Sequence, residues 1–129
     1  MQRCAFVALA AVLALATTLP ASAQVRRNFP AAALRGEMVM LQPPDLLLNG
    51  QPARLAPGAR IRDGQNMLVL SGALVNTRLV VHYTVEAHGL LLDVWVLNPA
   101  ELANQPWPRN AREAAIWSFD PVGQTWSKP

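Results

Sequence analysis

Turn-forming residues recur at short, regular intervals along the middle of the chain, and this rhythm constrains the fold more than any other feature. They separate brief apolar runs, and turn signals spaced about ten residues apart are typical of all-β barrels and sandwiches. The sequence therefore predicts a mainly β domain. The turn signals are Pro43-Pro44, Asn49-Gly50, Ala56-Pro57-Gly58, Asp63-Gly64 and His88-Gly89.

The Asn49-Gly50 pair lies between apolar residues and predicts a tight β-hairpin. A type I′ turn needs positive φ at both central positions, which Asn and Gly tolerate. A two-residue turn would pair Leu48 with Gln51, and Leu47 with Pro52. Because proline has no N–H to donate, we expect Pro52 at a sheet edge or a bulge.

Further strands are predicted between the other turns, at Glu37–Leu41, Asn66–Gly72, Arg78–Glu86 and Leu90–Leu97. Short strands in a small chain favour a small, partly open β-barrel of about five or six strands, of the OB or SH3-like kind. We expect residues 35–98 to form this barrel. A small β-sandwich is the alternative.

The two longest strands form a predicted hairpin whose two faces differ. A two-residue turn at His88-Gly89 would place one apolar set in the core, in the pairs Val81–Val96, Tyr83–Val94, Val85–Leu92 and Ala87–Leu90. The opposite face would be mixed, with His82 across from Trp95, Thr84 bonded to Asp93, and Leu91 and Leu97 alongside. A three-residue turn would shift the pairing of the two strands by one residue and turn the side chains of one strand to the other face, so the register stays open.

His82, Glu86 and Asp93 would share the mixed face, which raises the question of a metal site. Zinc takes about four ligands in a tight tetrahedron. Glu86 would lie about 13 Å along the strand from His82, at roughly 3.3 Å per residue. His88 would lie farther away still, in the turn. We therefore expect no metal ion and no cofactor.

The sequence contains no recognisable catalytic constellation. Ser71, Ser118 and Ser127 lack a nucleophile-elbow context, and there is no glycine-rich phosphate loop. Glycosidases use a pair of nearby carboxylates, and Glu86 and Asp93 could form such a pair. Any strand hairpin can bring two acidic residues this close, so the pair is not a specific signal. We predict a protein that is not an enzyme. The alternative is a weak metal-binding or hydrolytic protein that uses His82 and Asp93.

The character of the sequence changes at Asn98, from strands to short helices and aromatic residues. Asn98 can cap a helix over about Pro99–Asn104, with proline in the first turn and Glu101 three residues after the cap. A second helical turn is predicted over Asn110–Ile116. Turn chemistry at residues 120–123 would bring Trp117 and Phe119 opposite Trp126. Residues 99–129 are thus predicted to be an appendage packed on the barrel.

Residues 1–23 have the three parts of a secretory signal peptide: a basic start, an apolar run and the Ala21-Ser22-Ala23 motif. We expect cleavage after Ala23 and a periplasmic or secreted protein; an uncleaved N-terminal anchor is the alternative. Because Cys4 lies in this segment, the mature chain would have no cysteine. Residues 24–34 show no clear period and are predicted to be a flexible arm.

The charge pattern argues against nucleic acid as a partner. The net charge is only +3, and the arginines are scattered instead of forming a dense stripe. The chain has four tryptophans, a residue type favoured at interfaces. Either the C-terminal segment covers the mixed face, which we prefer, or the face is exposed and binds a partner. The candidate binding residues are His82, Leu91, Asp93, Trp95, Trp107, Trp117 and Trp126.

The run from Leu34 to Leu74 (LRGEMVML…SGAL), the long hairpin and the closing SFDPVGQTW resemble short exported, β-rich proteins of proteobacteria to which no activity is assigned. The LLLNGQPARLAPG element is similar to hairpins of small periplasmic β-modules. The resemblance implies no catalytic residues. We therefore expect an exported binding or accessory module of the cell envelope, which engages a protein or an envelope polymer through the tryptophans and a strand edge near Pro52.

Overall fold

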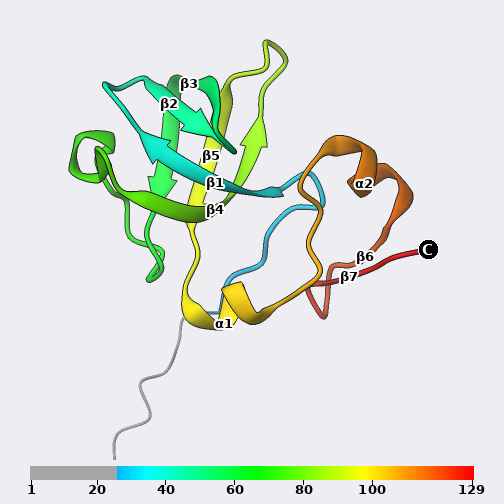
Figure 1. The fold of residues 1–129 in the computed structure, drawn as a ribbon. Coiled ribbons are helices and arrows are strands. Elements are labelled where there is room, and N and C mark those ends of the chain that lie inside the picture. Colours follow the sequence, from blue (N-terminus) through cyan, green and yellow to red (C-terminus); the bar gives the residue numbers. More distant parts are fainter. Residues whose placement is uncertain (1–25) are drawn as a thin grey trace, which may run out of the picture.

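A computed structural model of the chain describes residues 26–129, so the predicted signal peptide lies outside the described residues. Five strands form a closed barrel in the order β1-β2-β3-β5-β4, and β4 pairs back onto β1 (Figure 1). The β3–β5 pair is parallel and the others are antiparallel, which is the OB arrangement. The predicted small barrel is confirmed, but it is closed and not partly open. Its strands are β1 (Leu34–Met40), β2 (Asp45–Leu48), β3 (Gln51–Arg62), β4 (Arg78–Val85) and β5 (Leu91–Val96).

The hairpin at Asn49-Gly50 is confirmed. Leu48 pairs with Gln51, and Leu47 with Pro52. Asn49 and Gly50 have φ values of 53° and 78°, as a type I′ turn requires. The first partner of β3 in β5 is at Leu55, so Pro52 has a strand neighbour on one side only and needs no N–H on the other.

The turn predicted at Ala56-Pro57-Gly58 is wrong, because β3 runs through it without a break. The register of β3 against β5 shifts between Leu55 and Arg60, and Gly58 has a φ of 80°. Proline and glycine here form a bulge that bends one long strand from β2 towards β5. The same residues that signal a turn in the sequence therefore serve as a corner of the barrel.

The strand predicted at Asn66–Gly72 is also wrong. This segment is a loop with one isolated bridge, Arg62 to Leu68, followed by the short helix η1 (Ser71–Leu74). The loop bonds only to the end of β3, where the Val69 N–H donates to the Ile61 carbonyl at 2.9 Å and the Asp63 N–H to the Met67 carbonyl at 2.8 Å. The side chains of Met67, Leu68 and Leu70 are exposed.

The hairpin of β4 and β5 follows the predicted register at its base and departs from it near the turn. Val81 pairs with Val96, His82 with Trp95, and Tyr83 with Val94, as predicted. Val85 pairs with Leu91 and not Leu92, because β5 has one extra residue in a bulge.

The turn that joins these strands is wider than the predicted two residues. The Glu86 N–H donates to the Leu90 carbonyl at 2.9 Å. The Glu86 carboxylate accepts the backbone N–H groups of His88 and Leu90, at 2.7 and 3.0 Å. An acidic side chain that holds local backbone donors thus stabilises the wider turn.

The bulge reverses the facing of Leu91 and Leu92. Leu91 is 1% exposed and belongs to the barrel core, whereas Leu92 is exposed. The prediction that Leu91 lies on the binding face is therefore wrong. The barrel core also contains Met38, Met40, Leu46, Leu55, Ile61, Val81, Tyr83 and Val94.

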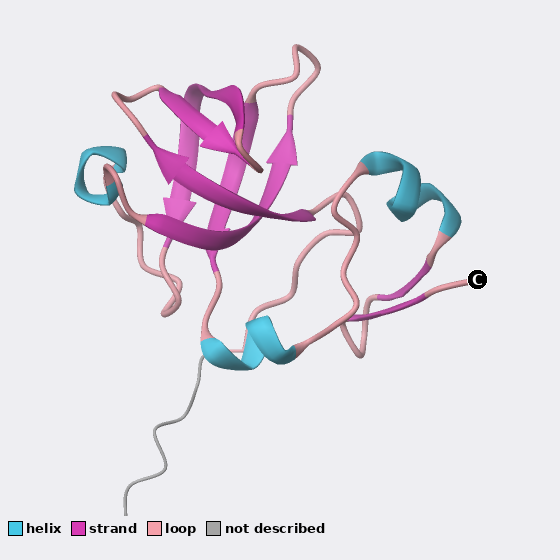
Figure 2. Cartoon of the chain, viewed as in Figure 1, coloured by secondary structure: helices cyan, strands magenta, loops and turns pink. Residues whose placement is uncertain are grey.

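The C-terminal appendage packs on one side of the barrel, away from η1 (Figure 2). It contains the helices α1 (Pro99–Ala103) and α2 (Ala111–Ile116) and the strands β6 (Ser118–Asp120) and β7 (Thr125–Ser127). The predicted Asn98 capping box and the Asn110 cap are both present. Phe119 pairs with Trp126 in the terminal hairpin, and their rings stack at 4.8 Å.

The N-terminal residues 26–33 lie between the barrel and this appendage (Figure 1). Arg27, Phe29 and Ala33 are buried, and Phe29 and Ala33 belong to a second apolar cluster with Leu97, Trp107 and Trp126. The prediction of a flexible arm is therefore wrong for this segment, because its side chains fill the space between the two parts. Within residues 26–129, no helix has the length and apolar character that a membrane crossing requires.

Candidate functional site

The only histidine of the barrel wall, His82, lies under the appendage and not on an open face. It is 1% exposed. Its ring stacks on Trp107 at 4.2 Å and meets the edge of Phe29 at 4.4 Å. His82 pairs with Trp95 across the hairpin as predicted, but its ring contacts are with Phe29 and Trp107. The predicted contact of Thr84 with Asp93 is confirmed, because the Asp93 N–H donates to the Thr84 hydroxyl at 3.2 Å.

Arg35 holds the His82 ring from β1. Its Nε and Nη2 both lie 3.1 Å from His82 Nε2. Nη2 also donates to the Glu101 carbonyl and Nη1 to the Asn104 carbonyl, both at 2.9 Å. Arg35 thus connects the barrel wall to the C-terminal end of α1.

Arg27 makes a second buried connection to the same helix. Its guanidinium pairs with the Glu101 carboxylate and donates to the carbonyls of Asp63 and Val96. Glu101 also accepts the Asn98 N–H, so one carboxylate caps α1 and neutralises the N-terminal segment. The ion pair joins residues 74 positions apart in the chain.

The surroundings of His82 strongly disfavour its charged form. Burial is the largest cause, and the charges of Arg35 and Arg27 add to it, which lowers the pKa of His82 from 6.5 to about 2. The ring is therefore neutral at physiological pH. Since an arginine is always protonated and only donates, His82 Nε2 must accept, and the ring proton is on Nδ1.

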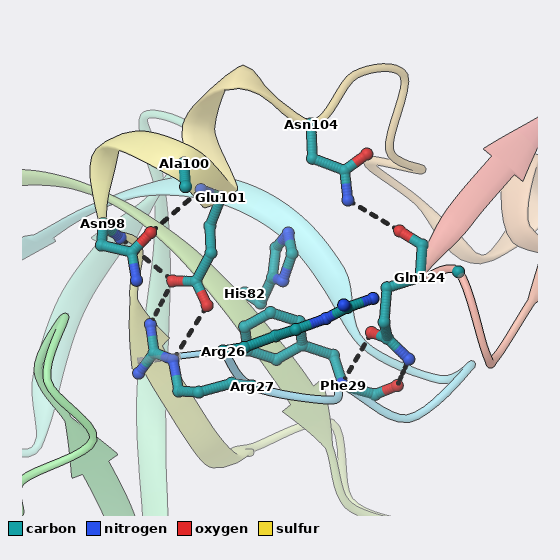
Figure 3. Close-up of a pocket in the computed structure, with 10 residues that line it drawn as sticks. Arg26, Arg27, Phe29, His82, Asn98, Ala100, Glu101, Asn104 and Gln124 are labelled. Atoms are coloured by element: carbon teal, nitrogen blue, oxygen red, sulfur yellow. Dashed lines mark hydrogen bonds and ion pairs between the residues drawn. The ribbon is translucent and has the colours of Figure 1, made fainter. Parts of the chain in front are cut away.

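Two hollows flank this buried network. The first, the junction pocket, has a volume of about 310 Å³ and is lined by Arg26, Phe29, His82, Ala100, Glu101 and Gln124 among others. Figure 3 shows the His82 ring behind Phe29, with Glu101 on one side and Asn104 and Gln124 on the other. The pocket lies where the N-terminal segment, α1 and the turn before β7 meet.

The second hollow, the Trp117 groove, is larger, at about 520 Å³. The barrel strands β1 and β4 form one wall through Arg35, Glu37 and Val80. The other wall comes from residues 102–117 and the C-terminal tail, and includes Trp107, Arg109, Trp117 and Lys128. Lys128 lies 5.2 Å from the Trp117 ring in a cation–π contact.

The structure separates the predicted binding residues into different environments. Trp107 and Trp126 are buried in the second cluster, and Trp95 packs against it, half-buried. The preferred expectation, that the appendage covers the mixed face, agrees with this burial. Asp93 is half-buried beside Thr84. Trp117 is the tryptophan that is half-buried and lines a groove beside charged side chains.

His82 and Asp93 do not converge with further ligands. Among residues 26–129, no group of three or more His, Cys, Asp or Glu side chains is placed to hold a metal ion. Comparison with known protein families, curated proteins and solved structures gives no match. The resemblance to short exported proteobacterial proteins stays a prediction.

Sequence reasoning missed Arg27, Arg35, Phe29 and Glu101, which surround His82. Three of these lie in or next to the segment interpreted as an arm, whose lack of period hid its burial. One signal was present: an apolar phenylalanine and a pair of arginines close to the first strand, in a chain with few aromatic residues.

Proposed function

We propose that the protein is an exported, non-catalytic binding module of the cell envelope, and that it holds an acidic envelope polymer in the Trp117 groove. The observation that carries this proposal is the juxtaposition of Trp117, Arg109 and Lys128 along one open groove of about 520 Å³. OB barrels can bind oligosaccharides on the outside of the barrel, at strands 2 and 3; in this protein the groove lies against β1 and β4.

The charges in the groove favour an anion. Glu37 is paired with Arg78 at 3.0 Å. The Glu113 carboxylate accepts the backbone N–H of Arg109, and the backbone N–H of Glu113 donates to the Asn110 side chain. Lys128 rests on an aromatic ring. Of the two carboxylates in the groove, that of Glu37 is paired with Arg78, so the cationic groups of Arg109 and Lys128 stand against that of Glu113 alone.

Arg35 adds to the excess of positive charge in the groove. Burial is the main cause that lowers the pKa of its guanidinium, the Glu101 carboxylate opposes the effect, and the nearby charge of Arg109 lowers the pKa further. Two like charges on facing walls of a groove repel each other, and a bound carboxylate or phosphate would relieve that repulsion.

A saccharide polymer suits the groove better than a globular partner. The groove opens to solvent, and a polymer segment can enter it with the barrel on one side and the appendage on the other. Trp117 offers an amphipathic ring at a wet edge, where the apolar C–H face of a sugar can pack. Arginine and lysine side chains then pair with its acidic groups.

The test is titration of the purified protein with polygalacturonate, with neutral dextran of matched length as the comparison. We expect tryptophan fluorescence to change with the acidic polymer only, and the affinity to fall as salt is raised. The double variant Arg109→Glu/Lys128→Glu should bind about tenfold more weakly or worse, because repulsion replaces attraction.

The matched control is the double variant Arg60→Glu/Arg112→Glu, which also reverses two exposed charges, both outside the groove. It should change the affinity by less than about twofold. Equal losses in the two variants would show non-specific charge attraction and contradict the proposal. So would an absence of binding to the acidic polymer at low salt.

The structure offers little support for the alternative, a metal-binding or hydrolytic protein that uses His82 and Asp93. The nitrogen of His82 that could accept a proton or a metal ion is bonded to Arg35, and two arginines oppose any added positive charge. The Asp93 side chain bonds to Thr84.

A further inference from the structure

The loop between β3 and β4 carries a run of apolar side chains that face water. Met67, Leu68 and Leu70 are 63%, 69% and 83% exposed. Val75, which follows η1 in the same loop, is also exposed. A single exposed apolar side chain is ordinary, but several large ones close together in one loop mark a surface that binds a partner or a membrane.

Backbone hydrogen bonds hold this loop in place, so its apolar side chains are not free to fold inwards. The Asp63 carboxylate accepts the backbone N–H groups of Gln65 and Met67, both at 2.9 Å. The Val69 N–H donates to the Ile61 carbonyl at 2.9 Å. Moving the apolar side chains onto the barrel would break these bonds, and the exposure is therefore a property of the folded loop.

The described chain enters the fold at the base of this loop. The Asp63 N–H donates to the Met67 carbonyl at 2.8 Å, and the Asp63 carbonyl accepts from Arg27 at 2.6 Å. Residues 1–25 precede this point, and they include the apolar run Ala5–Ala16 of the predicted signal peptide. A signal peptide enters a membrane during export, so the chain that follows it reaches the barrel beside Met67 (Figure 1).

The charges around the loop favour an anionic bilayer. Residues 64–77 contain no charged side chain. The carboxylate next to this stretch, that of Asp63, is bonded to the loop backbone. Arg62 forms a bridge with Leu68, and the exposed Arg26 precedes the arginine that bonds to the loop base. An uncharged apolar loop with arginines beside it complements anionic headgroups above an apolar interior.

We propose that this loop is a membrane-docking surface, which inserts Met67, Leu68 and Leu70 among the headgroups of an anionic bilayer while Arg26 and Arg62 pair with lipid phosphates. None of these residues lines the Trp117 groove, so the groove stays accessible in the docked protein. The docking surface does not depend on the function proposed for the groove.

The experiment measures co-sedimentation of the purified protein with vesicles of phosphatidylcholine, with or without phosphatidylglycerol. We expect binding to the anionic vesicles, and weaker binding as salt is raised. Leu68→Ser/Leu70→Ser should bind at least about tenfold more weakly, because less apolar surface leaves water. The matched control is Ile116→Ser/Val122→Ser, which removes two exposed apolar side chains of the appendage and should bind like the unchanged protein. All four positions are exposed, so the urea midpoints of the variants should stay close to that of the unchanged protein.

A fluorescent label identifies the part of the protein that enters the bilayer. With Cys4→Ser as the background, an environment-sensitive dye on Leu70→Cys should shift to shorter wavelength with anionic vesicles, whereas the dye on Val122→Cys should not. Arg26→Ala should weaken binding about fivefold, the usual contribution of one arginine near an anionic surface. Arg112→Ala, also exposed but on α2, should change it by less than about twofold.

Four results would overturn the proposal. The first is an absence of binding to vesicles with phosphatidylglycerol at low salt. The second is an equal loss in the two double variants, and the third is an equal dye response at the two labelled positions. The fourth is a dimer in solution that only Leu68→Ser/Leu70→Ser abolishes, since a second copy of the chain would then be the occupant of this surface.

Discussion

An Arg27→Ala substitution is expected to lower the free energy of unfolding by about 3–5 kcal/mol, the usual cost of removing one partner of a buried ion pair. The change leaves the Glu101 carboxylate without its cation in a site that is largely shielded from water. It also leaves the carbonyls of Asp63 and Val96 without their donor. Urea unfolding followed by tryptophan fluorescence measures the loss.

Two further variants distinguish the effect of breaking the buried ion pair from the effect of removing one positive charge. Arg26→Ala removes the adjacent, exposed arginine and should change the stability by no more than about 0.5 kcal/mol. The double variant Arg27→Met/Glu101→Leu should recover part of the loss, because apolar replacement of a whole buried pair is often tolerated. A cost below about 1 kcal/mol for Arg27→Ala would contradict the structure, since it is the value of an exposed pair.

Mild acid is expected to destabilise the protein through His82. The unfolded chain binds a proton at this histidine below pH 6.5, whereas the folded protein resists it down to about 2. Because the unfolded state binds more protons, stability falls as the pH drops through this window, by up to about 1.4 kcal/mol per pH unit. Between pH 6.5 and pH 5, where most carboxylates stay ionised, we expect a loss of about 1–2 kcal/mol.

A His82→Gln variant tests the origin of this slope. Its amide oxygen can accept from Arg35, but the side chain does not titrate, so stability should be nearly flat between pH 6.5 and pH 5 even if the variant is less stable overall. His88→Gln, in the exposed turn, should keep the slope of the unchanged protein. A slope that persists in His82→Gln would assign the acid sensitivity to another group.

The elements with strong local signals could be predicted from the sequence. The Asn49-Gly50 hairpin, both caps at Asn98 and Asn110, and the base of the β4–β5 hairpin depend on backbone preferences of neighbouring residues. The bulges could not be predicted in this way. Ala56–Gly58 and the extra residue of β5 are determined by barrel closure, which depends on strands far apart in the sequence.

The candidate site, too, could be predicted from the sequence only in part. His82 was a candidate because histidine is rare in this chain. Its neutral state and its fixed tautomer, however, come from Arg35, Arg27 and Phe29, which lie 47 to 55 positions earlier. No local pattern reports such contacts. Trp117 could be named as a candidate, but its place in a groove depends on how the appendage packs on β1 and β4.

The first and last parts of the described chain are in direct contact, since the Phe29 N–H donates to the Gln124 side chain, 95 residues away. Contacts this distant in sequence slow folding, because a long loop must close before they form. A nascent chain that emerges from its N-terminus cannot bury Phe29, or seat His82, until the segment with Gln124 has followed. The junction between the barrel and the appendage can therefore form only after the C-terminal segment has been made, so Phe29 stays uncovered in the partly emerged chain.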